Sequence, residues 1–118
     1  MKLICTFAAA GAVALLATSP AAPLTPPKLF GTVGPGFTIT LKQNGRAVKR
    51  LKPGSYTFVI ADKASIHNFV VEGPGVERDL TTVPFKGTKT VTIRLRKGKY
   101  KFYCRPHERS MFGFVTVT

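Results

Sequence analysis

Four residues of types that bind transition metals stand out in this sequence because they are scarce. Cys104, His107 and Met111 form a Cys-x-x-His-x-x-x-Met pattern, and His67 lies 37 residues before Cys104. The chain has only two histidines, two cysteines and two methionines. A thiolate and two imidazoles in one plane, with a long axial thioether, are the ligands of mononuclear blue-copper sites that transfer electrons. The pattern therefore predicts one copper ion, held by His67, Cys104 and His107 with Met111 as a weak fourth ligand.

Other kinds of site fit these residues poorly. A structural zinc site closes a tetrahedron with four Cys or His ligands, and only three such residues lie outside the apolar N-terminal segment that contains Cys5. A Cys-His nucleophilic pair needs a third orienting residue and an oxyanion hole, and neither is evident near Cys104. A second, catalytic copper centre needs more histidines than the chain has. We therefore expect a protein that is not an enzyme.

Two neighbouring residues are expected to support the site. Pro106 lies inside the loop, and its fixed φ limits how far the loop can rearrange. Asn68 directly follows His67, so its side-chain amide is placed to tie the segment of His67 to the loop after Cys104. The alternative for Asn68 is that it only ends a turn. A stiff loop favours fast electron exchange, because the ligands then move little between Cu(I) and Cu(II).

Short strands must position these residues, because apolar and polar side chains alternate from about residue 29 to the end. The runs are separated by turn sequences, among them Asn44-Gly45, Pro53-Gly54 and Gly73-Pro74-Gly75. This pattern predicts an all-β sandwich or barrel of seven or eight strands, with an irregular segment at residues 76–86. No helical periodicity competes with it outside the N-terminal segment.

The alternation also predicts where the candidate ligands point. His67 shares a strand face with Phe69, and Cys104 shares one with Phe102. Both candidate ligands are therefore expected to point inward, near one end of the sandwich. The loop after Cys104 carries the other two.

The first 21 residues have the character of an export signal. Lys2 supplies a basic start, residues 3–17 are apolar, and Ser19-Pro20-Ala21 is a small-x-small cleavage pattern. We expect a signal peptide at residues 1–21, a proline-rich linker at 22–29 and a copper-binding domain at 30–118. The mature chain would be periplasmic or extracellular, with Cys104 as its single cysteine. An uncleaved anchor is the alternative, although the apolar run is shorter than the roughly 20 residues of a membrane span.

The chain is strongly basic, since 18 Lys and Arg against 5 Asp and Glu give a net charge of +13. This charge favours anionic partners, and we expect redox proteins with acidic surfaces, or association with an anionic envelope. The basic residues of one region alternate with apolar ones, which indicates the solvated outward face of two adjacent strands and not a nucleic-acid site. They are Arg94, Arg96, Lys97, Lys99 and Lys101, joined by Lys49, Arg50 and Lys52. A monomer is expected.

Several segments resemble the cupredoxins, the family of plastocyanin, pseudoazurin, amicyanin and azurin. The matching pieces cover nearly all of residues 30–118: Ser65-Ile66-His67-Asn68-Phe69, Gly73-Pro74-Gly75, Gly87-Thr88-Lys89-Thr90 and Tyr100-Lys101-Phe102-Tyr103-Cys104-Arg105-Pro106-His107. The resemblance implies a Greek-key β-sandwich, His67, Cys104 and His107 as equatorial ligands, and Met111 as the axial ligand. It also implies one-electron transfer between larger redox proteins.

The loop departs from the best-known members of the family. Three residues separate His107 from Met111, one fewer than in plastocyanins and one more than in amicyanin, which leaves the geometry at Met111 and the reduction potential open. We expect electrons to pass through the exposed edge of His107, with Pro106 and Phe112 in the docking rim. The alternative functions are an envelope copper carrier or buffer with the same ligands, and a polyanion-binding sandwich.

Overall fold

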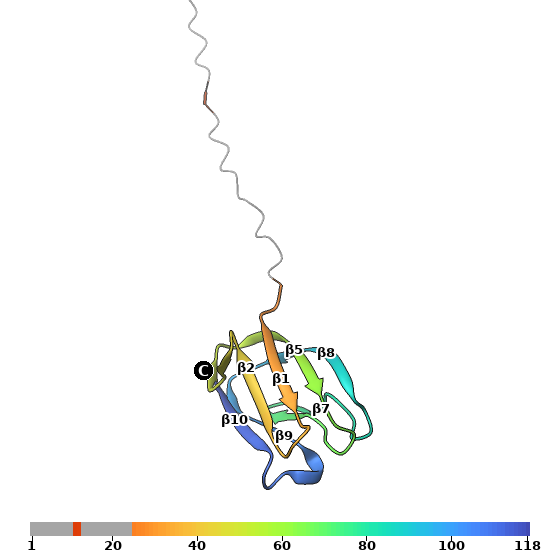
Figure 1. Cartoon of the computed structure of the whole chain (residues 1–118). Helices are drawn as coiled ribbons and strands as arrows, with labels where there is room; N and C mark the ends of the chain where they lie inside the picture. Colours follow the sequence, from red (N-terminus) through yellow and green to blue (C-terminus); the bar gives the residue numbers. More distant parts are fainter. Residues whose placement is uncertain (1–10, 13–24) are drawn as a thin grey trace, which may run out of the picture.

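The alternation of apolar and polar residues produces two facing β-sheets, seen from one side in Figure 1. The first sheet has the order β3-β2-β1-β5-β8, and the second has the order β4-β10-β9-β6-β7. The strands are β1 (Lys28–Val33), β2 (Ile39–Gln43), β3 (Arg46–Ala47), β4 (Arg50–Leu51), β5 (Gly54–Asp62), β6 (Val70–Gly73), β7 (Val76–Asp79), β8 (Gly87–Leu95), β9 (Gly98–Tyr103) and β10 (Phe112–Val117). The predicted β-sandwich is confirmed.

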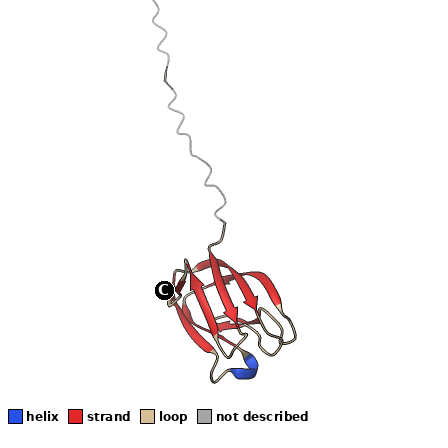
Figure 2. Ribbon diagram, in the orientation of Figure 1, coloured by secondary structure: helices blue, strands red, loops and turns tan. Residues whose placement is uncertain are grey.

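The computed structural model describes residues 11–12 and 25–118. The expected signal peptide at 1–21 lies outside these residues except for positions 11 and 12, so it stays a prediction. In the described part of the chain, no helix has the length and the apolar character that crossing a membrane requires. The one helix there is η1 (Arg105–His107), a single 3-10 turn drawn in blue in Figure 2.

The folded domain begins two residues earlier than the expected boundary at residue 30. Lys28 pairs with Thr57 of β5, and the side chain of Leu29 is fully buried. Both residues were assigned to the linker, because the prolines before them have no strand pattern and a lone apolar residue carries no periodicity. Burial of Leu29 against β5 is what joins this segment to the sandwich.

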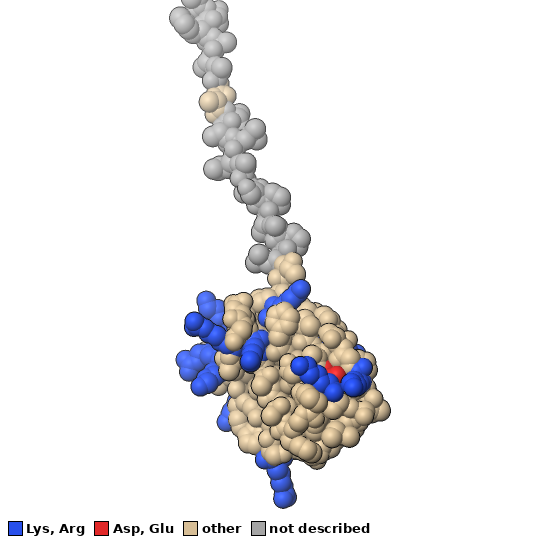
Figure 3. Space-filling model, in the orientation of Figure 1, with Lys and Arg blue, Asp and Glu red and all other residues tan. Residues whose placement is uncertain are grey.

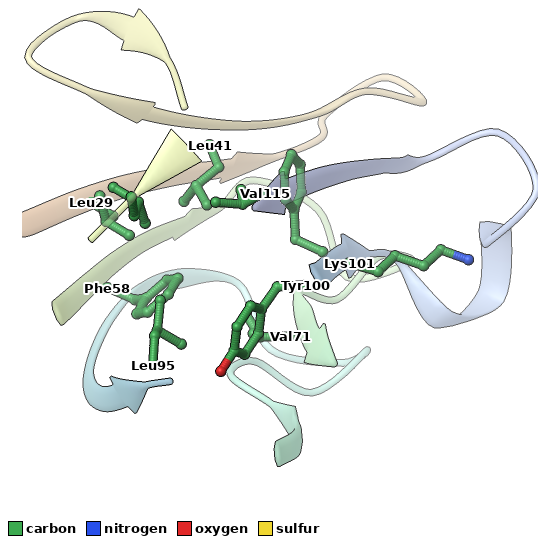
Figure 4. Close-up of a pocket in the computed structure, with 10 residues that line it drawn as sticks. Leu29, Leu41, Phe58, Val71, Leu95, Tyr100, Lys101 and Val115 are labelled. Atoms are coloured by element: carbon green, nitrogen blue, oxygen red, sulfur yellow. The ribbon is translucent and has the colours of Figure 1, made fainter. Parts of the chain in front are cut away.

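The core follows the alternation that the sequence predicted. In β5 the inward residues Tyr56, Phe58 and Ile60 are all buried, while the residues between them are partly exposed. Within the second sheet, the ring of Phe69, just before β6, stacks on that of Phe102 in the neighbouring strand β9 at a centroid distance of 5.8 Å. The core contains a small apolar cavity of about 10 Å³. Figure 4 draws the side chains that line it, which come from both sheets. A space this small and this apolar is too poor in polar partners to hold ordered water.

Three strand predictions were wrong. There are ten strands among the described residues and not seven or eight, since β3 and β4 are only two residues long. Part of the expected irregular segment is β7, which pairs with β6. The basic strands β8 and β9 are not adjacent: β8 pairs with β5 in the first sheet, whereas β9 pairs with β10 and β6 in the second. The turn before Gly98 is therefore a crossover between sheets.

The strand registers define two ends of the sandwich. Asp62, at the end of β5, pairs with Gly87 and lies level with Val33, whereas Gly54, at the start of β5, pairs with Leu95. In the second sheet, Tyr103 pairs with Phe112 at one end. That end carries the loop after Cys104, and we call it the loop end.

Candidate metal centre

The loop between β9 and β10 holds three of the four candidate ligands in a short, hydrogen-bonded turn. The amide of Cys104 donates to the carbonyl of Met111 at 3.0 Å, which continues the pairing of β9 with β10. The amide of His107 donates to the carbonyl of Cys104 at 3.1 Å, and the amide of Met111 donates to the carbonyl of His107 at 2.8 Å. Pro106 lies in the first turn of η1, where a missing N–H costs no hydrogen bond. The loop is thus closed on itself by its own backbone.

His67 reaches the same place from the connection between β5 and β6. The sequence predicted it inside a strand with Phe69, but β6 begins only at Val70, and His67 follows a turn at residues 65–66. Its amide donates to the carbonyl of Ala64 at 3.5 Å. The inward direction of the side chain was right, since His67 is fully buried. The turn at residues 65–66, and not a strand, thus directs the imidazole of His67 toward the loop end.

The donor atoms of His67, Cys104 and His107 form a small triangle. The Nδ1 atoms of the two histidines are 3.1 Å apart, and Sγ of Cys104 lies 3.7 Å from Nδ1 of His67 and 3.6 Å from Nδ1 of His107. Nitrogen and sulfur donors about 2.0–2.3 Å from one ion in a trigonal plane are separated by about 3.5–4.0 Å. The observed distances lie in or slightly below this range, so one ion fits among the three atoms.

The types of donor select the metal. One thiolate and two imidazoles, with a thioether beside them, suit copper better than a hard cation or a structural zinc ion. Met111 is 1% exposed and packs in the core cluster that includes Cys104. Among the described residues, one group of His, Cys, Asp or Glu side chains lies close enough together to hold a metal ion, and it consists of His67, Cys104 and His107. The arrangement of His67, Cys104, His107 and Met111 fits a single copper ion.

Burial separates one residue of the four from the rest. Cys104 and His67 are fully buried, and Met111 is nearly so, whereas His107 is half-buried. A substrate in solution therefore has no access to the sulfur of Cys104, which argues against a nucleophilic role for this thiol. Of the four candidate ligands, His107 is thus the one that is partly exposed to solvent.

Phe37 is a neighbour of the centre that no motif of the sequence points to. Its ring stands edge-on to both imidazoles, with centroids 5.3 Å from His67 and 4.9 Å from His107. It is 60% exposed, and it precedes β2, so it covers the centre from outside. The only sign of this role in the sequence is the position of an aromatic residue directly after the glycine-rich turn at residues 34–36.

Asn68 links the two segments that carry the candidate ligands. Its side-chain carbonyl accepts a hydrogen bond of 2.8 Å from the amide of Arg105, and its amide nitrogen donates to Asp79 at 3.4 Å. Asp79 also pairs with the guanidinium of Arg105 at 2.5 Å. This hydrogen bond is the main reason that the pKa of Arg105 is raised. Asn68 itself is 1% exposed, so it is part of the core and not only the end of a turn.

A buried carboxylate lies behind His67. Asp62 is 2% exposed, and burial raises its pKa above the usual value, although hydrogen bonds from the Thr81 hydroxyl and the Ala64 amide oppose the rise. Its Oδ2 and the Nε2 of His67 are buried atoms without a hydrogen-bond partner among the described residues. The electrostatic interaction with His67 also lowers the pKa of Asp62, as the two hydrogen bonds do.

Comparisons with known proteins agree with this centre. The family model of copper-binding proteins of the plastocyanin/azurin family matches residues 32–118. A search of curated proteins finds no match. Among solved structures, reduced rusticyanin is 17% identical with a TM-score of 0.53, covering 77% of this chain and 76% of its own. A reduced amicyanin variant is 16% identical with a TM-score of 0.52, covering 81% and 87%. At these identities the likeness concerns the fold.

Proposed function

The chain belongs to the plastocyanin/azurin family of copper-binding proteins, and on that premise we propose that it is an exported one-electron carrier. In this proposal His67, Cys104 and His107 hold one copper ion and Met111 is its weak fourth ligand. Bound copper supplies a one-electron Cu(I)/Cu(II) couple. The protein's own residues supply the binding, the restraint and the route to the surface.

The observation that carries the proposal is the buried donor triangle with one exposed edge. Cys104 and His67 are sealed from solvent, so the centre excludes water and competing ligands. His107 is half-buried, and its ring is the short path by which an electron enters or leaves. The aromatic ring of Phe37 and the exposed side chains of Ile66 and Pro106 surround this path. A partner that docks there comes close to the centre.

Restraint of the loop supports electron transfer over catalysis. Backbone hydrogen bonds close the loop from Cys104 to Met111, and Asn68 ties it to the segment of His67. A centre that changes its geometry little between two oxidation states exchanges electrons quickly. The N-terminal sequence supports export of the protein. The net charge of +13 supports redox partners with acidic surfaces.

The test of the metal centre uses the purified protein with one equivalent of Cu(II). We expect an intense visible thiolate-to-copper band and a narrow copper hyperfine splitting in the electron paramagnetic resonance spectrum. Cys104→Ser should abolish both. Arg109→Ser, at an exposed position of the same loop, should keep both. A pale spectrum that does not change in Cys104→Ser would reject the blue-copper assignment.

A second measurement separates an electron carrier from a copper carrier with the same ligands. Mixtures of the reduced and oxidised protein report the electron self-exchange rate through broadening of their NMR lines. Transfer of copper to a chelator reports how easily the ion leaves. We expect electron self-exchange to be much faster than copper transfer, and the reverse order would favour the copper carrier.

A further inference from the structure

Basic side chains lie over much of the surface of this domain, with Lys63, Lys86 and Arg109 near the loop end, whereas acidic ones are few. At the end of the sandwich opposite the loop end, the charged side chains are all basic, and we call this the basic end. Its residues are Arg46, Lys49, Arg50, Lys52, Arg96, Lys97 and Lys99, and every one of them is exposed. Figure 3 shows several Lys and Arg gathered on the upper left of the domain, with further basic side chains on the right, around an acidic one, and at the lower tip.

Strand pairing brings these residues together from separate parts of the sequence. Arg46 pairs with Gln43 at the far end of β2, and Arg50 pairs with Thr116 near the end of β10. Thr116 in turn pairs with Lys99 at the start of β9. The basic end therefore spans both sheets, because β3 belongs to the first sheet and β4 to the second.

The carboxylates of the chain do not neutralise this end. Glu72, Glu77 and Asp79 lie on β6 and β7, Glu108 lies in the loop after η1, and Asp62 is buried at the loop end. These are all five acidic residues of the sequence. The ion pairs among the described residues use Lys101 and Arg105, and none uses a residue of the basic end. The residues of the basic end are therefore exposed, and Glu72, which lines a groove with Lys99, is the carboxylate beside it.

The chain also enters the domain at this end. β1 starts with Lys28, which pairs with Thr57 in the half of β5 nearer Gly54. The continuous described segment 25–118 begins just before this strand, on the upper side of the domain in Figure 1. The apolar N-terminal segment at residues 3–17 is thus joined to the domain on the same side as the basic end.

We propose that the basic end lies against an anionic lipid surface and holds the metal centre away from it. Clusters of four or more Lys and Arg near a membrane surface are attracted to its anionic headgroups. An acidic electron-transfer partner is a poorer occupant of this end. The nine residues of β5 place it about 30 Å from the loop end, and electron transfer slows steeply with distance.

This proposal rests on the proposed export of the chain but not on the copper site. Its test uses the full chain without metal, so a failure here and a failure of the spectroscopic test are distinguishable. Vesicles of phosphatidylglycerol are compared with vesicles of phosphatidylcholine, because the apolar segment binds both whereas the basic residues favour the anionic lipid. We expect the protein to prefer the anionic vesicles, and the preference to fall with added salt.

Matched variants localise the effect. Replacing Arg46, Lys49, Arg50 and Lys52 by Gln removes four charges from the basic end. Replacing the exposed residues Lys63, Arg78, Lys86 and Lys89 by Gln removes four from the rest of the surface. We expect the first variant to lose at least about tenfold of the anionic preference and the second to lose far less. Equal losses in both variants, or no preference in the natural chain, would overturn the proposal.

Hydrogen exchange gives the orientation. On anionic vesicles, the backbone amides of residues 46–52 and 96–99 should exchange more slowly than in solution, whereas those of residues 105–110 should be unchanged. Protection of the loop in place of the basic end would show that the metal centre faces the lipid, and would equally overturn the proposal.

Discussion

The side-chain carbonyl of Asn68 accepts the backbone amide of Arg105 at 2.8 Å, and this hydrogen bond joins two segments that are 37 residues apart in the sequence. One segment carries His67, and the other carries Cys104 and His107. The spacing of the three donor atoms therefore depends on a residue that is not itself a candidate ligand.

Asn68→Ala should loosen this connection. The variant leaves the Arg105 amide without its partner and removes a buried side chain, so we expect a loss of about 1–3 kcal/mol in the free energy of unfolding of the metal-free protein. Urea denaturation measures it. The control is Ser110→Ala, because that hydroxyl is exposed and makes only a 3.4 Å contact to the carbonyl of His107. Equal stability of both variants would contradict a structural role for Asn68.

Phe37→Ala should open the metal centre without unfolding the protein. Phe37 is 60% exposed, so we expect less than about 1 kcal/mol of destabilisation. Its ring covers both imidazoles, and its removal should speed the loss of bound copper to a chelator. The matched control is Phe30→Ala, since Phe30 is 50% exposed on β1 and makes no ring contact with either histidine. The prediction fails if the two variants lose copper at the same rate.

Asp62→Asn should stabilise the metal-free protein at neutral pH. Burial raises the pKa of Asp62 in the folded state above its ordinary value of 3.8. As pH rises from 3.8 toward the higher pKa of the folded state, Asp62 loses its proton more readily in the unfolded chain than in the folded protein. Asp62 therefore lowers the free energy of unfolding in this pH range and at every higher pH. Below about pH 3.8 both states are protonated and the penalty disappears.

Urea titrations of the metal-free protein between pH 3 and pH 8 measure this dependence. The advantage of Asp62→Asn should grow as pH rises from the acid end and then level off. Glu72→Gln, at an exposed position, serves as the control and should show no such trend. An Asn variant that is less stable than the natural protein at pH 7 would show that ionised Asp62 is stabilised by its surroundings.

Met111→Leu distinguishes a ligand from an ordinary core residue. The exchange nearly conserves volume, so we expect a change of less than about 1.5 kcal/mol in the stability of the metal-free protein. The blue absorption should persist, because it arises from the thiolate of Cys104, whereas the reduction potential should shift, because the axial ligand tunes it. Voltammetry measures the potential. An unchanged potential would mean that Met111 only fills the core in which it is buried.

Local features of this centre were readable from the sequence. Cys104, His107 and Met111 lie in one short loop, so their spacing along the chain nearly determines their spacing in space. The inward faces of the strands were also readable, because side chains alternate with a period of two whatever the strand pairs with. These two signals were sufficient for the β-sandwich, for the loop and for the choice of copper.

The tertiary structure alone decided which distant segments meet. His67 reaches Cys104 from a turn and not from a strand, Phe37 covers both imidazoles, and β8 and β9 separate into different sheets. Alternation says which way a side chain points but not which strand lies beside it. That choice depends on how all the inward faces pack together, and it is also what gathers the basic end from separate parts of the sequence.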